Sequence, residues 1–182
     1  TQFAMLQSNV EPFPESEAEQ IITQELQRSP QQIYASFEPK PLAAASTAQV
    51  HRATLPDGSA VVVKVQRPDI DLTVRADLNV IKDLMRLTEQ RFAWARNADL
   101  AAITTEYADN ILLELDYTNE AFNGRLLAQN MAVFPCVHVP KVYTDLSTQR
   151  IMTQEFVKGV KITNVKAIDE AGLDRTALAV TF

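Results

Sequence analysis

Apolar positions near the start of the chain have the three- and four-residue spacing of short helices. Ser16 followed three residues later by Glu19 has the pattern of a capping box, which predicts a helix beginning there. Ser29 and Pro30 predict the start of a second short helix, because proline is well tolerated at the first helical position. Residues 1–14 lack this spacing, and their prolines favour an extended backbone.

Longer helices are predicted farther along the chain. From Asp69 onward, apolar residues recur at helical spacing over several turns. A further helix is expected to begin at Asp99, whose side chain can cap it, and to continue as far as Gln129. A last amphipathic helix is expected from about Asn164, with an interruption at Gly172.

Two segments joined by a tight turn give the clearest strand signal. Residues 49–55 and 60–65 are rich in apolar and β-branched side chains, and Pro56-Asp57-Gly58 between them has the residues of a turn. Residues 137–143 and 150–156 predict two further strands. Because helices and strands do not alternate strictly, the pattern predicts an α+β fold with an antiparallel sheet.

The composition is that of an ordinary globular protein. Of 182 residues, 46% are apolar and 22% are charged, and the net charge is −6. An acidic balance without a basic stripe argues against a nucleic-acid partner. No apolar run approaches the roughly 18 residues that span a bilayer. Cys136 is the single cysteine and is expected to be buried, and with only two histidines besides, a zinc cluster is not expected.

The small-residue segment Ala43-Ala44-Ala45-Ser46-Thr47 has the properties of a phosphate-binding turn. A phosphate needs backbone N–H groups at close range, and small side chains permit the approach that glycines usually provide. Alanines disfavour positive φ, so this loop would be stiffer than a glycine loop. The alternative is a turn of small residues that packs beneath a helix.

Lys64 ends the apolar run of the second strand. A lysine on a central strand is costly unless an acidic group pairs with it, and such a cation after a small-residue turn is typical of a kinase-type nucleotide site. Candidate partners are the acidic residues Glu106, Asp109, Glu114, Asp116 and Glu120. Asp116 and Glu120 are expected to share a helix face. The alternative is an edge lysine that extends into water.

Three segments resemble the UbiB/ADCK family of atypical protein-kinase-like proteins, also called the ABC-one family. They are PLAAASTAQVHRATLPDGSAVVVKVQRPDI at 41–70, ELDYTNEAFN at 114–123 and VPKVYTDLSTQRIMTQEFVKGVKI at 139–162. They follow the family's order, and the resemblance spans most of residues 6–175. It implies a protein-kinase-like N-lobe with an antiparallel sheet, long inserted helices and part of a helical N-terminal extension.

The resemblance implies individual roles in ATP binding. The alanine-rich loop that replaces the kinase glycine loop is matched by Ala43, Ala44, Ala45 and Ser46. Lys64 matches the lysine that contacts the α- and β-phosphates, and Glu120 matches the helix glutamate that pairs with it. These two residues are therefore the expected catalytic residues.

Further matches concern the adenine and a regulatory motif. Val62 stands where kinases usually carry a small alanine beneath the adenine, a departure that would tighten or shift the purine slot. Glu155 and Val157 match the hinge, where the C=O of Glu155 and the N–H of Val157 would meet the adenine edge. Glu114 and Asp116 match the family's regulatory ExD motif, which in relatives faces the N-terminal extension over the active site.

The resemblance implies ATP and Mg²⁺ as cofactors, with the metal ligands outside this sequence. The catalytic loop and the metal-binding Asp-Phe-Gly-like segment are expected after Phe182, and the lysine-x-glycine-glutamine motif is expected before Leu6. The implied division is a partial helical N-terminal extension at 1–38, a kinase-like N-lobe at 39–157 and the start of a C-lobe at 158–182.

The function implied is the ATP-binding portion of a UbiB-type atypical kinase or ATPase in isoprenoid quinone or other prenyl-lipid metabolism, inactive alone because it lacks the catalytic loop. The alternative is a nucleotide-sensing pseudokinase scaffold that regulates a lipid-biosynthesis complex. The expected partners are a nucleotide and either a membrane or lipid-biosynthesis proteins. The expected location is a plastid, a mitochondrion or the periphery of a bacterial membrane, and residues 144–162 favour plastid or cyanobacterial members.

Overall fold

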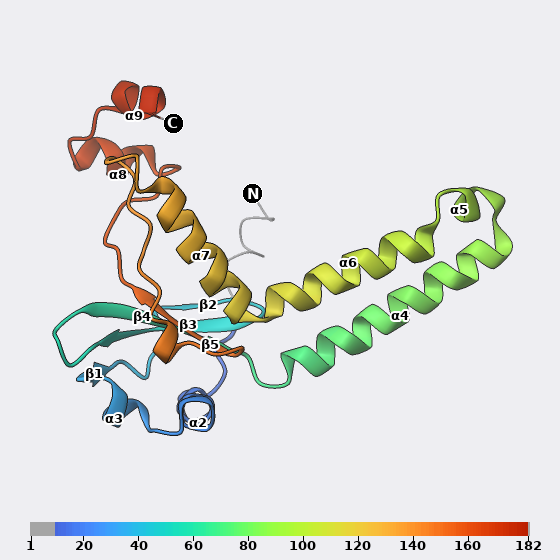
Figure 1. Ribbon diagram of the computed structural model, residues 1–182, viewed down its shortest axis with the longest axis horizontal. Coiled ribbons are helices and arrows are strands. Elements are labelled where there is room, and N and C mark those ends of the chain that lie inside the picture. Colours follow the sequence, from blue (N-terminus) through green and yellow to red (C-terminus); the bar gives the residue numbers. More distant parts are fainter. Residues whose placement is uncertain (1–9, 182) are drawn as a thin grey trace.

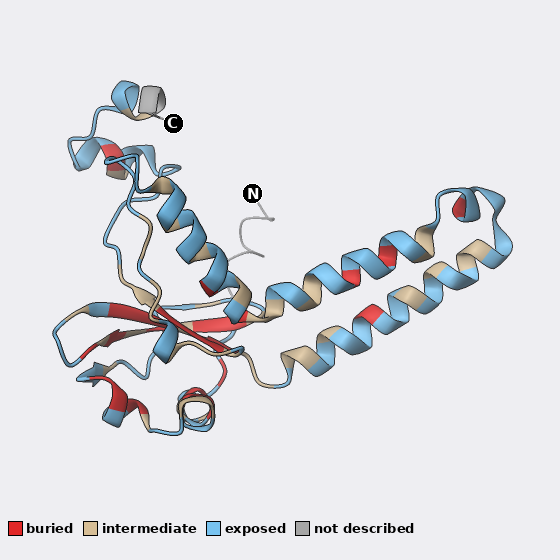
Figure 2. Ribbon diagram, in the orientation of Figure 1, coloured by how far each residue is buried: buried red, intermediate tan, exposed pale blue. Residues whose placement is uncertain are grey.

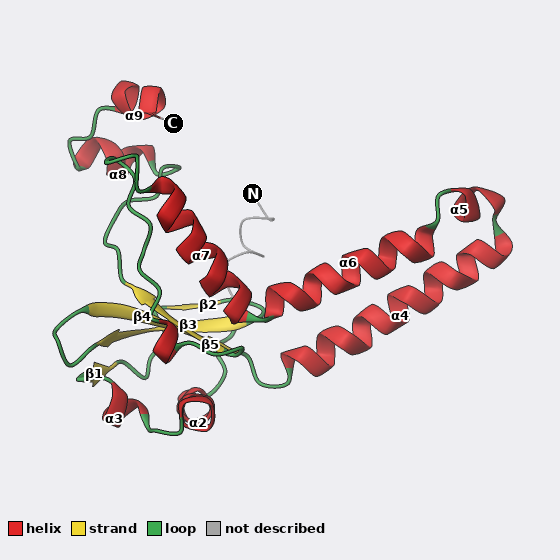
Figure 3. Cartoon of the chain, in the orientation of Figure 1, coloured by secondary structure: helices red, strands yellow, loops and turns green. Residues whose placement is uncertain are grey.

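The computed structural model of the protein describes residues 10–181. Within this range one antiparallel sheet carries helices on both sides, and a long helical hairpin projects away from it (Figures 1 and 3). The strand order is β1-β3-β4-β5, with β2 also paired to β3. The strands are β1 (Ser36–Phe37), β2 (Ala43–Ala44), β3 (Ala48–Thr54), β4 (Ala60–Gln66) and β5 (Ile151–Glu155). The predicted α+β fold with an antiparallel sheet is confirmed.

The helices fall into three groups. Helices α2 (Glu15–Leu26) and α3 (Pro30–Ile33) precede the sheet. The projecting hairpin consists of α4 (Ile70–Arg91) packed against α6 (Leu100–Leu115), with α5 (Ala93–Asn97) at its tip (Figure 1). Helix α7 (Tyr117–Met131) rises from the sheet, and the chain ends through the 3₁₀ turn η1 (Thr144–Leu146), β5, α8 (Val165–Glu170) and α9 (Arg175–Thr181).

The predicted β-hairpin is confirmed. Strands β3 and β4 pair along their whole length, with Val50 opposite Lys64. Gly58 in the connecting turn has φ +87°, a backbone conformation that glycine adopts without strain, and its N–H donates to the C=O of Leu55 at 2.9 Å. Since β4 lies between β3 and β5, Lys64 sits on a central strand, and the alternative of an edge lysine is wrong.

The two faces of the sheet differ because successive side chains of a strand point to opposite sides. On one face, Val61, Val63 and Val65 of β4 are fully buried in a core shared with α2 and α3 (Figure 2). On the other face, Lys64 lies opposite Met152 of β5, and Met152 packs with Tyr117 of α7. The N-terminal helices therefore close one face and leave the other for a site.

The predicted helix from Asp99 to Gln129 is wrong in its length. The start is confirmed, because the Asp99 side chain accepts a hydrogen bond from the N–H of Ala102. The helix ends at Leu115, however, and α7 begins two residues later. Asp116 between them has non-helical backbone angles (φ −90°, ψ 103°) and caps α7, so it does not share a helix face with Glu120 as expected.

The predicted strand at 137–143 is also wrong. Val142 forms an isolated bridge with Gln154, and Tyr143 donates its N–H to the C=O of Thr153, but residues 137–141 form no strand. Pro140 lacks the N–H that a ladder needs at that position. Cys136 in the preceding loop is exposed, contrary to the expectation that it is buried.

Of the two predicted starts of the N-terminal helices, that of α3 is confirmed and the capping box of α2 is wrong. The predicted start of a short helix at Ser29-Pro30 is confirmed, because Ser29 is the N-cap of α3 and its N–H donates to Gln32 Oε1. Helix α2 begins at Glu15 after Pro14, without a side-chain cap, so Ser16 and Glu19 do not form the expected box. Proline at the N-cap already fixes the backbone that a capping box would otherwise select.

Candidate functional site

The ammonium group of Lys64 is paired with the carboxylate of Glu120. Lys64 Nζ donates to Glu120 Oε2 at 2.7 Å, joining the central strand β4 to the first turn of α7. The two side chains keep 28% and 46% of their accessible surface. The pair is therefore neither a solvated surface contact nor a sealed core pair, and a ligand can reach the ammonium group.

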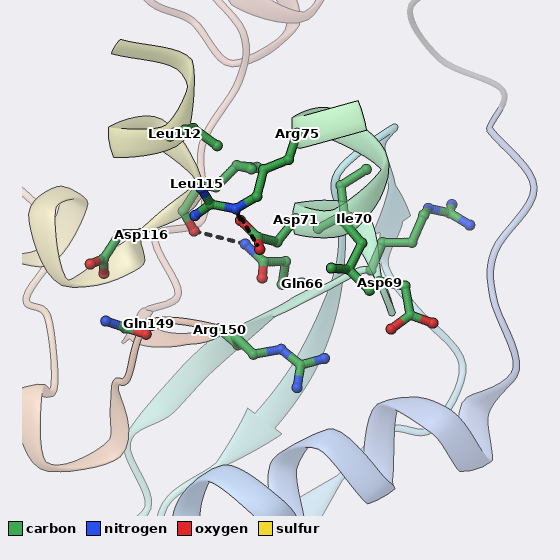
Figure 4. Close-up of a pocket in the computed structure, with 12 residues that line it drawn as sticks. Gln66, Asp69, Ile70, Asp71, Arg75, Leu112, Leu115, Asp116, Gln149 and Arg150 are labelled. Atoms are coloured by element: carbon green, nitrogen blue, oxygen red, sulfur yellow. Dashed lines mark hydrogen bonds and ion pairs between the residues drawn. The ribbon is translucent and has the colours of Figure 1, made fainter. Parts of the chain in front are cut away.

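Helix α7 is positioned by hydrogen bonds at its start. The Nε2 of Gln66, two residues after Lys64, donates to the C=O of Leu115 at the end of α6 (2.7 Å), and the N–H of Tyr117 donates to the C=O of Gln149 (3.0 Å). Figure 4 shows the first of these bonds beside a cavity of about 370 Å³. Because β4 and the loop just before β5 both anchor this junction, the first turn of α7 cannot shift freely along β4.

Asp116 stabilises the junction between α6 and α7. Its Oδ1 accepts from the N–H of Thr118 at 2.9 Å and from the Thr118 hydroxyl at 2.6 Å. These bonds satisfy donors that the first turn of α7 would otherwise leave free. Asp116 thus helps set the direction in which α7 presents Glu120.

Tyr117 lies against Lys64 on the same face of the sheet. Its ring is buried against Ala48 and Met152, and Lys64 Nζ lies 4.5 Å from the ring centroid. Burial raises the pKa of the Tyr117 hydroxyl well above its usual range, with a further contribution from the nearby Glu120 carboxylate. Tyr117 was not among the predicted site residues, although its place three residues before Glu120 on one helix face was a usable signal.

A cleft of about 1100 Å³ gathers most of the predicted polar site residues. Its lining includes Lys64, Tyr117 and Glu120, together with both residues of the predicted regulatory motif, Glu114 and Asp116. Glu114 thus lies in the same cleft, but the ion pair of Lys64 is with Glu120. Negative and positive groups therefore meet in one concave region between β4, α6 and α7.

The alanine-rich segment forms a short strand and a tight turn. Ala43 and Ala44 make up β2, and the N–H of Ala45 donates to the C=O of Ala48 at 2.8 Å. Ser46 is exposed, so the alternative of a turn packed beneath a helix is wrong. Thr47, at the end of this turn, is the part of the segment that lines the cleft.

The predicted adenine-binding residues lie farther along the sheet. Val62 shares the face of Lys64 two residues earlier on β4 and is almost fully buried. Val157 follows the end of β5 and is exposed. Neither lines the cleft described above.

The Glu155 side chain at the end of β5 contacts Lys141 and His138. Its Oε2 accepts from the N–H of Lys141 at 3.1 Å and lies 3.0 Å from His138 Nε2. The Lys141 amide holds the pKa of the Glu155 carboxyl below its usual range, and His138 adds to this effect. The segment 138–141 thereby fixes the strand end where the predicted hinge begins.

The described part of the chain shows neither a cluster of metal ligands nor a membrane-spanning helix. Among residues 10–181, no group of three or more histidine, cysteine, aspartate or glutamate side chains is arranged to hold a metal ion. None of the helices described there combines the length and the apolar character that crossing a bilayer requires.

Comparison with known proteins gives consistent similarities. Residues 5–182 match the family described as the ABC1 atypical kinase-like domain. The chain is 40% identical over 183 residues to Protein ACTIVITY OF BC1 COMPLEX KINASE 8, chloroplastic, of Arabidopsis thaliana, covering 97% of this chain and 23% of that protein. It is 35% identical over 174 residues to the Probable protein kinase UbiB of Marinobacter nauticus, covering 96% and 32%.

A solved structure shares the fold. The complex of Rv3197 with erythromycin from Mycobacterium tuberculosis superimposes with a TM-score of 0.72 at 31% identity, covering 84% of this chain and 38% of that one. The present chain therefore spans about a quarter to a third of the length of the curated relatives above and somewhat more of the solved one.

Proposed function

The chain belongs to the ABC1 atypical kinase-like family, and on this premise we propose that it is the ATP-binding portion of a UbiB-type kinase or ATPase. The membership confirms the resemblance inferred from the sequence. The observation that carries the proposal is the Lys64–Glu120 pair, which joins a central strand to the helix above it on the open face of the sheet.

The chemistry of this pair suits a nucleotide phosphate. An ammonium group has three N–H donors, and Lys64 gives one of them to Glu120. The exposed fraction of the Lys64 side chain leaves room for an anionic oxygen. We propose that Lys64 neutralises charge on the α- and β-phosphates and that Glu120 holds it in place.

The other predicted site residues are proposed to contact different parts of the same ATP molecule. The turn at Ala43–Ser46 would cover the phosphates, Val62 would lie against the purine, and the backbone of Glu155 and Val157 would meet the adenine edge. Mg²⁺ would supply positive charge that offsets the charge of the phosphates. As the family resemblance implies, its ligands are proposed to lie outside this sequence.

The proposed pathway is isoprenoid quinone or other prenyl-lipid metabolism. The UbiB name of the Marinobacter relative supports this assignment, and the chloroplastic relative is compatible with a plastid setting. We propose a membrane or lipid-biosynthesis proteins as partners. ATP hydrolysis by the full-length protein separates an enzyme from the alternative, a nucleotide-sensing scaffold, because a scaffold binds ATP without turnover.

The melting temperature of the full-length protein, measured with increasing Mg-ATP, tests the binding proposal. A specific ligand raises the melting temperature with its concentration. We expect this rise in the parent protein and in Lys82→Ala, a control on α4 outside the cleft, but not in Lys64→Ala. An equal rise in Lys64→Ala, or no rise in the parent, would contradict the proposal.

A further inference from the structure

The contact between Lys64 and the ring of Tyr117 has no place in the roles set out above. We infer that Tyr117 is a positioning residue, whose ring face holds the Lys64 ammonium group in the orientation that a nucleotide phosphate requires. The inference rests on the proposed function, because it concerns the same lysine. It adds a specific second support, an aromatic face, to the carboxylate of Glu120.

The geometry is that of a cation–π contact. Lys64 Nζ lies 4.5 Å from the centroid of the Tyr117 ring, within the roughly 6 Å over which the negative ring face attracts a cation. The ring itself is 3% exposed and packs on Ala48 and Met152. A ring held this firmly offers a fixed surface, whereas a free side chain would move with the lysine.

The ion pair alone leaves the ammonium group loosely defined. Glu120 keeps nearly half of its surface, and a carboxylate so exposed is screened by water and can swing away. With one N–H directed at Glu120, the ammonium group of Lys64 keeps further donors for another partner. An anionic oxygen entering the cleft would meet those donors.

The ring, and not the hydroxyl, performs this role. The Tyr117 Oη atom is buried and has no hydrogen-bond partner among the residues that the structure describes. Removing it should therefore leave the support of Lys64 intact. Tyr117→Phe is expected to bind Mg-ATP within about twofold of the parent, because phenylalanine keeps a negative ring face.

The test replaces residue 117 in the full-length protein by phenylalanine and by phenylalanines carrying one to five fluorine atoms. Fluorination preserves the shape of the ring and progressively removes the negative potential of its face. We expect the Kd for Mg-ATP to rise step by step, reaching about three- to thirtyfold. The Kd for adenosine, which has no phosphates, is expected to stay constant across the series.

Three results separate the outcomes. A constant Kd for Mg-ATP across the series, in a protein where Lys64→Ala still abolishes binding, overturns the role of Tyr117 and leaves the proposed function standing. Undiminished binding in Lys64→Ala overturns the proposed function itself. Parallel losses for ATP and adenosine would show that the ring only supports the fold, which also overturns the inference.

A matched control completes the design. Tyr117→Leu, which removes the ring, should weaken Mg-ATP binding in the parent. Tyr143→Leu is the control, because Lys141 Nζ lies over the Tyr143 ring at a similar 4.8 Å outside the cleft. It should leave the Kd for Mg-ATP unchanged.

Discussion

Replacing Glu120 by glutamine should separate the role of the ion pair in binding from its role in folding. At the 2.7 Å separation of Lys64 Nζ and Glu120 Oε2, Coulomb's law in water gives an attraction of about 1.5 kcal/mol. The cost of ordering two long side chains, both partly solvated, reduces the net value to about 1 kcal/mol or less. The glutamine oxygen can also still accept a hydrogen bond from the Lys64 ammonium group.

The free energy of unfolding of Glu120→Gln should therefore fall by no more than about 1 kcal/mol in urea titrations. Its affinity for Mg-ATP should fall more clearly, by about five- to tenfold in titration calorimetry, because Lys64 loses the charged group that orients it. A matched variant is Glu114→Gln, which changes the same chemistry in the same cleft but makes no ion pair with Lys64.

Two results would refute this reasoning. If Glu120→Gln binds Mg-ATP like the parent while Glu114→Gln does not, the functional partner of Lys64 in the bound protein is Glu114. If Glu120→Gln instead loses several kcal/mol of stability, the pair belongs to the structural core, and its exposure has been misjudged.

Three further predictions concern the fold around the site. Val63→Ala should lower the free energy of unfolding by about 2–3 kcal/mol, because Val63 is fully buried and the lost methyl groups leave a cavity, as urea titration will show. Burial lowers the pKa of His51 in the folded protein. The unfolded chain therefore binds a proton at this residue more readily than the folded chain does. Neutral His51 contributes stability above about pH 6.5, and this contribution is lost as the pH falls through the folded pKa. His51→Gln should flatten this slope in urea titrations between about pH 7 and pH 5. Asp116→Ala should cost about 1 kcal/mol in the same titrations, whereas Asp116→Asn, which can still accept from the Thr118 amide, should stay near the parent.

The sequence predicted those parts of the fold whose signals are local. The β3–β4 hairpin follows from β-branched strands and a Pro-Asp-Gly turn, and the Asp99 cap follows from a single side chain. The break at Asp116 was missed because the apolar spacing of α6 continues into α7 without a gap. An N-cap aspartate within a continuous helical pattern resembles an ordinary exposed residue.

Other errors arose where one rule overrode another. Val142 and its neighbours have strand-like residues, but Pro140 and an exposed loop limit the pairing to a single bridge. The signal of Ser16 and Glu19 was a valid pattern, but Pro14 had already determined where α2 begins.

The site was only partly accessible to sequence reasoning. Spacing reduced the candidate partners of Lys64 to five acidic residues, and the family resemblance selected Glu120 among them. No local rule could do so, because the choice depends on the hydrogen bonds from Gln66 and Tyr117 that set α7 against the sheet. The function of the nucleotide-binding residues and the division into extension, N-lobe and C-lobe stay predictions.

Covalent labelling with an acyl-phosphate derivative of ATP measures directly whether Lys64 meets the phosphates of a bound nucleotide. The reagent acylates an amine held beside the phosphates, and mass spectrometry identifies the modified residue. Among the lysines of this chain, we predict selective modification of Lys64, suppressed by excess Mg-ATP. Modification spread over the exposed lysines, or labelling of Lys64 that Mg-ATP does not suppress, would contradict the account.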